Sequence, residues 1–138
     1  MRNIFILLSI LFITDVGTCL GIDATICNPG SEITYHSNGQ LKACSLKDNF
    51  AINGVTCEQF GFIHIYDNGA LESCDTADIF IYGDISCNQH RQISFYPNGK
   101  LQSCDLSRPI KIDDKSCAEL KAISLFDNGK LKSCSSPQ

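Results

Sequence analysis

A thirty-residue repeat constrains the fold of this chain more than any other feature of its sequence. Asn-Gly pairs recur at Asn38-Gly39, Asn68-Gly69, Asn98-Gly99 and Asn128-Gly129. Two series of cysteines keep the same step: Cys27, Cys57, Cys87 and Cys117, and then Cys44, Cys74, Cys104 and Cys134. Several independent columns with one period predict tandem units that pack mainly on their neighbours. We expect a single repeat domain over residues 20–138. Its units would be 27–56, 57–86, 87–116 and 117–138.

Each Asn-Gly pair lies between short runs of β-forming residues, which predicts a β-hairpin. A two-residue type I′ turn needs positive φ at both central residues, and Asn-Gly is the pair that best tolerates this. Folding the third unit about Asn98-Gly99 would place Tyr96 opposite Leu101. The same register would place Ile93 opposite Cys104. One face would then carry an aromatic–Leu pair, and the other face would carry Ile and Cys.

The aromatic position of this hairpin recurs and forms the one candidate binding stripe. Its members are His36, Tyr66, Tyr96 and Phe126. Rings stacked at one phase could line a ribbon for a peptide, a glycan or an apolar partner. Alternatively, they are ordinary cross-strand partners of the leucine column. We favour the second interpretation, because the predicted register gives each aromatic a leucine partner.

The connectors between these hairpins are predicted to form hairpins of their own. The segments 50–57, 80–87 and 110–117 align, and each alternates around a tight-turn pair such as Asn53-Gly54. This register places a cysteine opposite Phe50, Phe80 or Ile110. No segment reads as a helix. The predicted fold is therefore all-β: tandem β-hairpin repeats that form a meander or solenoid-like twisted sheet.

Nine cysteines in 138 residues indicate a disulfide framework if the chain leaves the cytosol. Two pairings of the repeating cysteines are open. Pairing within units gives Cys27–Cys44, Cys57–Cys74, Cys87–Cys104 and Cys117–Cys134, and leaves none of the eight unpaired. Pairing across units gives Cys44–Cys57, Cys74–Cys87 and Cys104–Cys117, and leaves two unpaired. We favour pairing within units for that reason, although spacing alone does not fix connectivity.

The N-terminus predicts export. Arg2 precedes an apolar run from Ile4 to Ile13, which is too short to span a bilayer as a helix and is typical of a signal peptide. We expect a leader over residues 1–19 and a secreted, periplasmic or cell-envelope protein. Cleavage before Leu20 and cleavage before Cys19 are both open. The latter would allow lipidation of Cys19 and hence a lipid anchor. No later stretch is apolar enough to predict a transmembrane segment.

The sequence predicts no catalytic, metal or cofactor site. The three histidines (His36, His64 and His90) lie at different phases of the repeat, whereas a repeated ligand set would keep one phase. Serines recur before the cysteines at Ser73, Ser103 and Ser133 without a recurring histidine, so we interpret them as strand residues. A net charge of −4, with 11 Lys and Arg spread along the chain, argues against a nucleic-acid partner.

The segment Phe95-Tyr96-Pro97-Asn98-Gly99-Lys100-Leu101 resembles the variant MORN repeat, with an aromatic pair followed by Asn-Gly and Leu. The resemblance implies an all-β hairpin array that serves as an interaction module, and bacterial proteins with this repeat are often labelled as an antitoxin family. We therefore expect a non-enzymatic exported repeat protein, structural or interacting, whose partner is an unknown protein or glycan. The alternative is an extracytoplasmic inhibitor or antitoxin-like protein that binds one specific partner protein.

Overall fold

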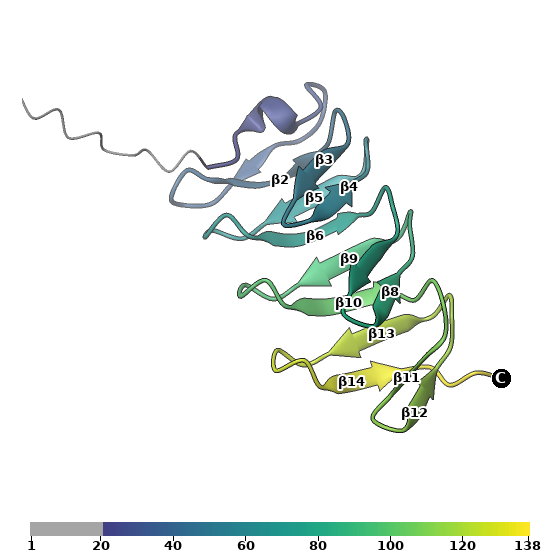
Figure 1. Cartoon of the computed structure of the whole chain (residues 1–138). Helices are drawn as coiled ribbons and strands as arrows, with labels where there is room; N and C mark the ends of the chain where they lie inside the picture. The colour runs from purple at the N-terminus through teal and green to yellow at the C-terminus, as the bar shows by residue number, and fades with distance from the viewer. Residues whose placement is uncertain (1–20) are drawn as a thin grey trace, which may run out of the picture.

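The computed structural model describes residues 21–138, and over these residues the protein is all-β. Fourteen strands form antiparallel hairpins, preceded by one three-residue 3-10 turn, η1 (Ala24–Ile26). The hairpins follow one another in an elongated stack, so the predicted fold class is confirmed (Figure 1). The proposed leader and Cys19 lie outside the described residues. Within the described part, no helix has the length and apolarity that crossing a bilayer requires.

Eight strands form one antiparallel sheet in the order β1-β2-β5-β6-β9-β10-β13-β14. They belong to the four hairpins that contain the Asn-Gly pairs. Their bounds are β1 (Thr34–Tyr35), β2 (Leu41–Ser45), β5 (Phe62–Ile65), β6 (Leu71–Asp75), β9 (Gln92–Phe95), β10 (Leu101–Asp105), β13 (Ala122–Leu125) and β14 (Leu131–Cys134). Strand pairs β2·β5, β6·β9 and β10·β13 join successive hairpins, so the sheet runs through the whole array.

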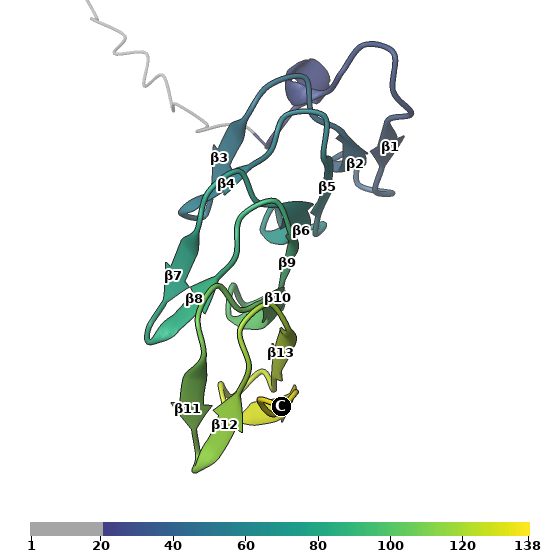
Figure 2. The same cartoon turned by 90° about the vertical axis from the view of Figure 1, so that its right-hand side faces the viewer.

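The connectors form a second layer of three two-stranded hairpins. These are β3 (Phe50–Ile52) with β4 (Val55–Cys57), β7 (Phe80–Tyr82) with β8 (Ile85–Cys87), and β11 (Ile110–Ile112) with β12 (Lys115–Cys117). They stand over one face of the large sheet and leave its other face uncovered (Figure 2). The predicted pairing of cysteine with Phe50, Phe80 and Ile110 is confirmed. Connector strands form ladders only within their own hairpins, and single bridges, Cys57 with Thr76 and Cys87 with Leu106, link β4 and β8 to the ends of sheet hairpins. The meander therefore consists of the sheet hairpins alone.

The turns of the sheet hairpins are not the predicted two-residue type I′ turns. In the hairpin β5–β6, Gly69 N donates to Tyr66 O at 2.9 Å and Tyr66 N donates to Ala70 O at 2.8 Å. Gly69 has a φ of +82°, and Asn68 is not among the residues with positive φ. The loop is therefore a type I turn followed by a left-handed glycine. Asn68 has a different role, because its Oδ1 accepts a hydrogen bond from Ala70 N at 3.0 Å.

An extra residue in the second strand of the sheet hairpins shifts the register. In the hairpin β9–β10, Ser94 pairs with Ser103, but the next residue, Phe95, pairs with Leu101. Two residues of β10 thus face one residue of β9, which makes Gln102 part of a β-bulge. A one-residue shift moves every following side chain to the opposite face of the strand.

This bulge overturns one part of the predicted register. Tyr96 does not lie opposite Leu101, and in the other three hairpins the leucine likewise pairs with the residue before the aromatic. Farther from the turn, Ile63 pairs with Cys74 as predicted. The shift brings Leu71 onto the same face as Cys74, and each is 1 % exposed. The leucines therefore pack in the core and not against the aromatic stripe.

The core lies between the sheet and the connector hairpins. Ile63 and Leu71 on the inner face of the sheet are buried in the same cluster as Val55 of β4. The rings of Phe80 in β7 and Phe95 in β9 meet edge to face, with centroids 5.9 Å apart. Apolar residues from both layers thus share one continuous core.

Four disulfides bind each sheet hairpin to the segment that precedes it, which is a connector hairpin in three cases and the chain after η1 at Cys27 in the first. The bonds are Cys27–Cys44, Cys57–Cys74, Cys87–Cys104 and Cys117–Cys134, which is the within-unit pairing. Cys57 ends a connector strand and Cys74 lies in the sheet, so the bond crosses between layers. Each bond spans a sequence separation of 17. Closing a loop of this size contributes about 3 kcal/mol in the chain-entropy account.

Candidate functional site

The candidate binding stripe lies along one edge of the sheet, where each member begins a turn. His36 Nε2 lies 2.6 Å from Ile65 O in the next hairpin. The hydroxyl of Tyr66 donates to Phe95 O at 2.9 Å, and the hydroxyl of Tyr96 donates to Leu125 O at 2.8 Å. These polar groups are therefore occupied within the protein. Each of these side chains links its own hairpin to the backbone of the next one, and we call such a link a strut.

Phe126, the last member of the stripe, differs from the other three. It has no hydroxyl and is 46 % exposed, whereas the first three members are half-buried. The ammonium of Lys132 lies 5.8 Å from the centre of its ring, within the range of a cation–π contact. The four residues thus lie along one edge but do not present one uniform aromatic surface.

Partial burial strengthens the preference of the Tyr66 hydroxyl for its protonated form. Partial burial raises the pKa of the Tyr66 hydroxyl above its ordinary value of 10.0, and the nearby Glu72 and Tyr96 raise it further. A raised pKa means that the neutral phenol is favoured, because the phenolate is the costly form in this setting. Tyr66 therefore keeps its proton and remains a donor at neutral and mildly alkaline pH.

Asparagines at the turns reinforce the same edge. Asn38 Nδ2 donates to Asp67 O, and Asn68 Nδ2 donates to Pro97 O, both at 3.1 Å. Their Oδ1 atoms accept from the backbone of their own loops. Each of these two side chains thus bonds both its own turn and the following one, so they link the first three turns to each other.

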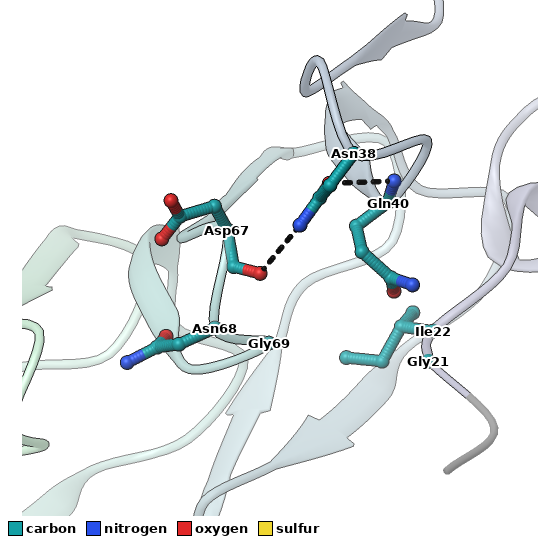
Figure 3. A pocket seen from close by; sticks show the side chains of 7 residues that line it. All are labelled: Gly21, Ile22, Asn38, Gln40, Asp67, Asn68 and Gly69. Carbon is teal, nitrogen blue, oxygen red and sulfur yellow. Dashed lines mark hydrogen bonds between the residues drawn. The ribbon is translucent and has the colours of Figure 1, made fainter. Parts of the chain in front are cut away.

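A hollow of about 390 Å³ lies at the N-terminal end of this edge. It is lined by Gly21, Ile22, Asn38, Gln40, Asp67, Asn68 and Gly69. Figure 3 shows the Asp67 carboxylate and the Asn68 amide turned away from the Gln40 side. Gln40 packs tightly on Gly21, where an added Cβ would meet Gln40 Oε1. The hollow therefore gathers no convergent set of charged groups, and we regard it as the weaker candidate.

The uncovered face of the sheet carries a straight row of small, mostly hydroxyl-bearing side chains. Each member lies directly opposite the next across neighbouring strands. The row is Thr34, Ala43, His64, Ser73, Ser94, Ser103, Ser124 and Ser133, one residue from each strand; we call it the hydroxyl row. Flanking inner residues such as Ile123 and Leu125 are buried, so Ser124 between them faces outward.

Hydrogen bonding within the hydroxyl row is incomplete. Ser94 Oγ and Ser103 Oγ lie 2.6 Å apart and share a hydrogen bond. Ser73 is 8 % exposed, and no other described residue bonds to its hydroxyl. No fully buried side-chain oxygen or nitrogen among the described residues lacks a partner. The Ser73 oxygen therefore reaches the outer face, where it must bond to something outside the fold.

Two depressions lie along the hydroxyl row. The first, of about 230 Å³, is lined by Glu32, Thr34, Lys42, Ala43, Cys44, Phe62 and His64. The second, of about 400 Å³, is lined by Arg91, Gln92, Ser103, Cys104, Asp105 and Ala122. The outer face therefore has two separate depressions, one over β1, β2 and β5 and one over β9, β10 and β13, and each has members of the hydroxyl row on its floor. We call this face, from the first depression to the second, the trough.

Sequence reasoning missed this row. It identified Ser73, Ser103 and Ser133 as strand residues, but not Ser94 and Ser124 as their partners. The available signal was a second set of columns with the same period: 34, 64, 94 and 124 beside 43, 73, 103 and 133.

His64 and Ser73 are opposed across β5 and β6, which brings together a histidine and a serine. No hydrogen bond joins their side chains, and His64 is followed at its phase by Ser94 and Ser124. Over residues 21–138 there is also no group of three or more His, Cys, Asp or Glu side chains placed to hold a metal ion.

A comparison of the chain with models of known protein families gives one match. Residues 91–105 match the family model described as the MORN repeat variant. The match spans β9, its turn and β10, so it includes Tyr96 and the Ser94–Ser103 pair. The third hairpin is thus a MORN-like repeat, as the resemblance implied. No curated protein and no solved structure matches the chain.

Proposed function

We propose that this chain, whose third sheet hairpin is a MORN-like repeat, is a non-enzymatic exported scaffold that binds its partner on the outer face of the large sheet. The observation that carries the proposal is the hydroxyl row. It crosses all eight strands at one register, and the hydroxyl of Ser73, which is 8 % exposed, has no partner among the described residues. Repeats of this kind act mainly through such extended surfaces.

Export is supported by the disulfides together with the apolar leader-like segment. Bonds such as Cys57–Cys74 join residues that are 0 % and 1 % exposed, which is typical of structural cystines. Such bonds persist in oxidising compartments and are rare in the cytosol. Secretion and attachment to the cell envelope both fit these features.

A non-enzymatic role is supported by the uniformity of the row. Catalysis needs different groups that converge on one reacting atom. Here the same hydroxyl chemistry recurs on six of the eight strands, which suits many equivalent weak contacts with a long partner. Specificity would come from the side chains along the trough.

The export part is tested by the intact mass of the natively produced protein before and after reduction. We expect a chain that starts at Cys19 or Leu20. Reduction should add two hydrogens for each of the four disulfides. An intact leader with free thiols would overturn the proposal of export.

The binding part is tested by retention of the tagged protein on the envelope or extracellular matrix of the producing cells. Ser124→Arg places a bulky charge in the C-terminal half of the hydroxyl row, on β13, and should reduce retention. Ala51→Arg adds the same charge to the exposed side of β3 in the connector layer and should not. Equal retention of both variants would show that the outer face is not the binding surface. A tight stoichiometric protein partner, lost in Ser124→Arg, would favour the inhibitor or antitoxin-like alternative.

A further inference from the structure

We propose that the hydroxyl row binds a neutral glycan chain that runs across the strands, along the axis of the repeat array. This inference rests on the proposed function and names the ligand class of the same face. The inference is based on one arrangement of side chains: the hydroxyls of the row lie along the trough, and an aromatic ring, carboxylates and an amide lie beside them.

The geometry of the row suits a polymer with regularly spaced polar groups. Neighbouring strands in a sheet lie about 4.8 Å apart, so one residue per strand repeats at that step. A hydroxyl both donates and accepts, and so pairs with another hydroxyl whichever way that partner is oriented. A chain of sugar rings offers hydroxyls of this kind along its length.

The unpartnered Ser73 provides an independent reason to place a ligand here. Its side chain is almost wholly buried, yet its hydroxyl has no bond within the protein. Ser124, farther along the row, is half-buried and likewise bonds to no other described side chain or carbonyl. Neither residue lines a depression: Ser73 lies between the two in the row, and Ser124 lies opposite Ser103 of the second. Both hydroxyls are held on the outer face by their strands, so a ligand that runs along the row would meet preoriented groups and little side-chain entropy would be lost.

The sides of the trough carry the other contacts that sugars use. The Phe62 ring is 61 % exposed and lies next to His64 in the row, so it offers a flat apolar surface to a sugar ring. Asp75 pairs across the sheet with Gln92, and together they place a carboxylate and an amide beside the row. Carboxylates accept strong hydrogen bonds from hydroxyl donors.

The charge pattern of the trough favours a neutral ligand. Lys42 lies in the first depression with Glu32, and in the second Arg91 Nε lies 3.8 Å from Asp105 Oδ2. Both signs are therefore interspersed along the row. A polyanion such as a nucleic acid or an acidic polysaccharide would need a continuous basic stripe.

A peptide added as an extra strand fits this face less well. Strand addition needs unpaired backbone groups at an edge. Each inner strand, from β2 to β13, is paired on both sides, so the face offers side chains only.

The experiment is a titration of the oxidised protein with two neutral hexasaccharides, cellohexaose and chitohexaose, followed by calorimetry and by backbone amide chemical shifts. We expect at least one to bind, with shifts along the hydroxyl row. The corresponding disaccharide should bind at least about tenfold more weakly, because it reaches fewer strands. A hexamer of galacturonic acid should bind more weakly than the neutral chain.

Three variants locate the site. Ser124→Arg should weaken binding at least about tenfold, whereas Ser124→Thr, which keeps the hydroxyl, should stay within about twofold. Ala51→Arg in the connector layer should leave binding unchanged. Each variant is first checked for a native amide spectrum.

The inference is overturned if neither neutral hexamer binds, if the acidic hexamer binds more tightly, or if the shifts lie on the connector hairpins. Its failure can be told apart from failure of the scaffold proposal. Retention on the envelope that is sensitive to Ser124→Arg, without competition by either neutral hexamer, refutes the glycan and keeps the scaffold. Face-to-face dimers seen by ultracentrifugation and lost in Ser124→Arg would assign the face to a second copy of the chain.

Discussion

The hydroxyl of Tyr66 donates a hydrogen bond to the carbonyl oxygen of Phe95, at a sequence separation of 29 and a distance of 2.9 Å. The same bond recurs from Tyr96 to Leu125. A side chain at the start of one turn thus fixes the backbone at the end of the first strand in the next hairpin. These bonds act between units, whereas the disulfides act within them.

Removing one such hydroxyl should weaken the junction between two units. Tyr96→Phe leaves Leu125 O without its donor, and we expect the free energy of unfolding to fall by about 1 kcal/mol. Urea unfolding measures the change. Tyr35→Phe is the matched control, because Tyr35 is 54 % exposed and its hydroxyl bonds to no other described residue. Equal effects of the two variants would contradict a structural role for the strut.

The bulge at Gln102 should be more sensitive to deletion than to substitution. Deleting Gln102 removes the extra residue and turns Leu101 away from the core, which should cost at least about 3 kcal/mol. Gln102→Ala keeps the residue count and should stay within about 0.5 kcal/mol of the parent. Chemical unfolding of both variants provides the comparison. A deletion no worse than the alanine variant would show that the bulge does not set the register.

Loss of a central disulfide should cost more than loss of the last one. Replacing Cys57 and Cys74 together by serine should lower stability by about 3 kcal/mol through loop entropy, plus a burial penalty. The Cys117–Cys134 pair closes a loop of the same length, but Cys134 is only half-buried. The difference between the two double variants in urea unfolding therefore isolates the burial penalty. The two double variants should be equally destabilised if the cystines act through chain entropy alone.

The raised pKa of Tyr66 predicts a loss of stability at high pH. The folded state holds the phenol proton more tightly than the unfolded state, whose pKa is near 10.0. Above that pH the folded state therefore binds more protons, and stability falls as pH rises. Below it this contribution is fully present. Reversible unfolding followed from pH 8 to 11 should show a steeper alkaline decline for the parent than for Tyr66→Phe, as expected from linkage. Parallel curves would rule out Tyr66 as the group responsible.

Local signals predicted the connectors well. Asn53 and Gly54 both have positive φ, at 51° and 79°, and form the tight turn that their identities favour. The register that follows from this turn, Phe50 opposite Cys57, is the observed one. Nothing beyond the eight residues of the hairpin was needed for this prediction.

At the sheet hairpins the Asn-Gly pair led to a wrong prediction of the turn type. The turn type there is decided by which side chains must be buried in the core. Leu101 and Cys104 are three positions apart, so a regular strand would place them on opposite faces. Both are needed in the core, and a bulge is the way to bring them there. Apolar residues at a spacing of three within a strand were the available sign. Without that shift the predicted register still places Ser94 opposite Ser103, but it puts Leu101 on their face and not in the core.

The disulfides also set how far the array can lengthen under tension. Each cystine joins the two ends of its loop, so that loop cannot extend when the chain is pulled. A unit can release only the chain between one cystine and the next, such as the thirteen residue steps from Cys44 to Cys57. Fully extended, that stretch spans at most about 45 Å. Under tension, the oxidised array would therefore lengthen in equal, limited steps, one for each unit. It would not reach the full contour length of the chain unless the disulfides were reduced.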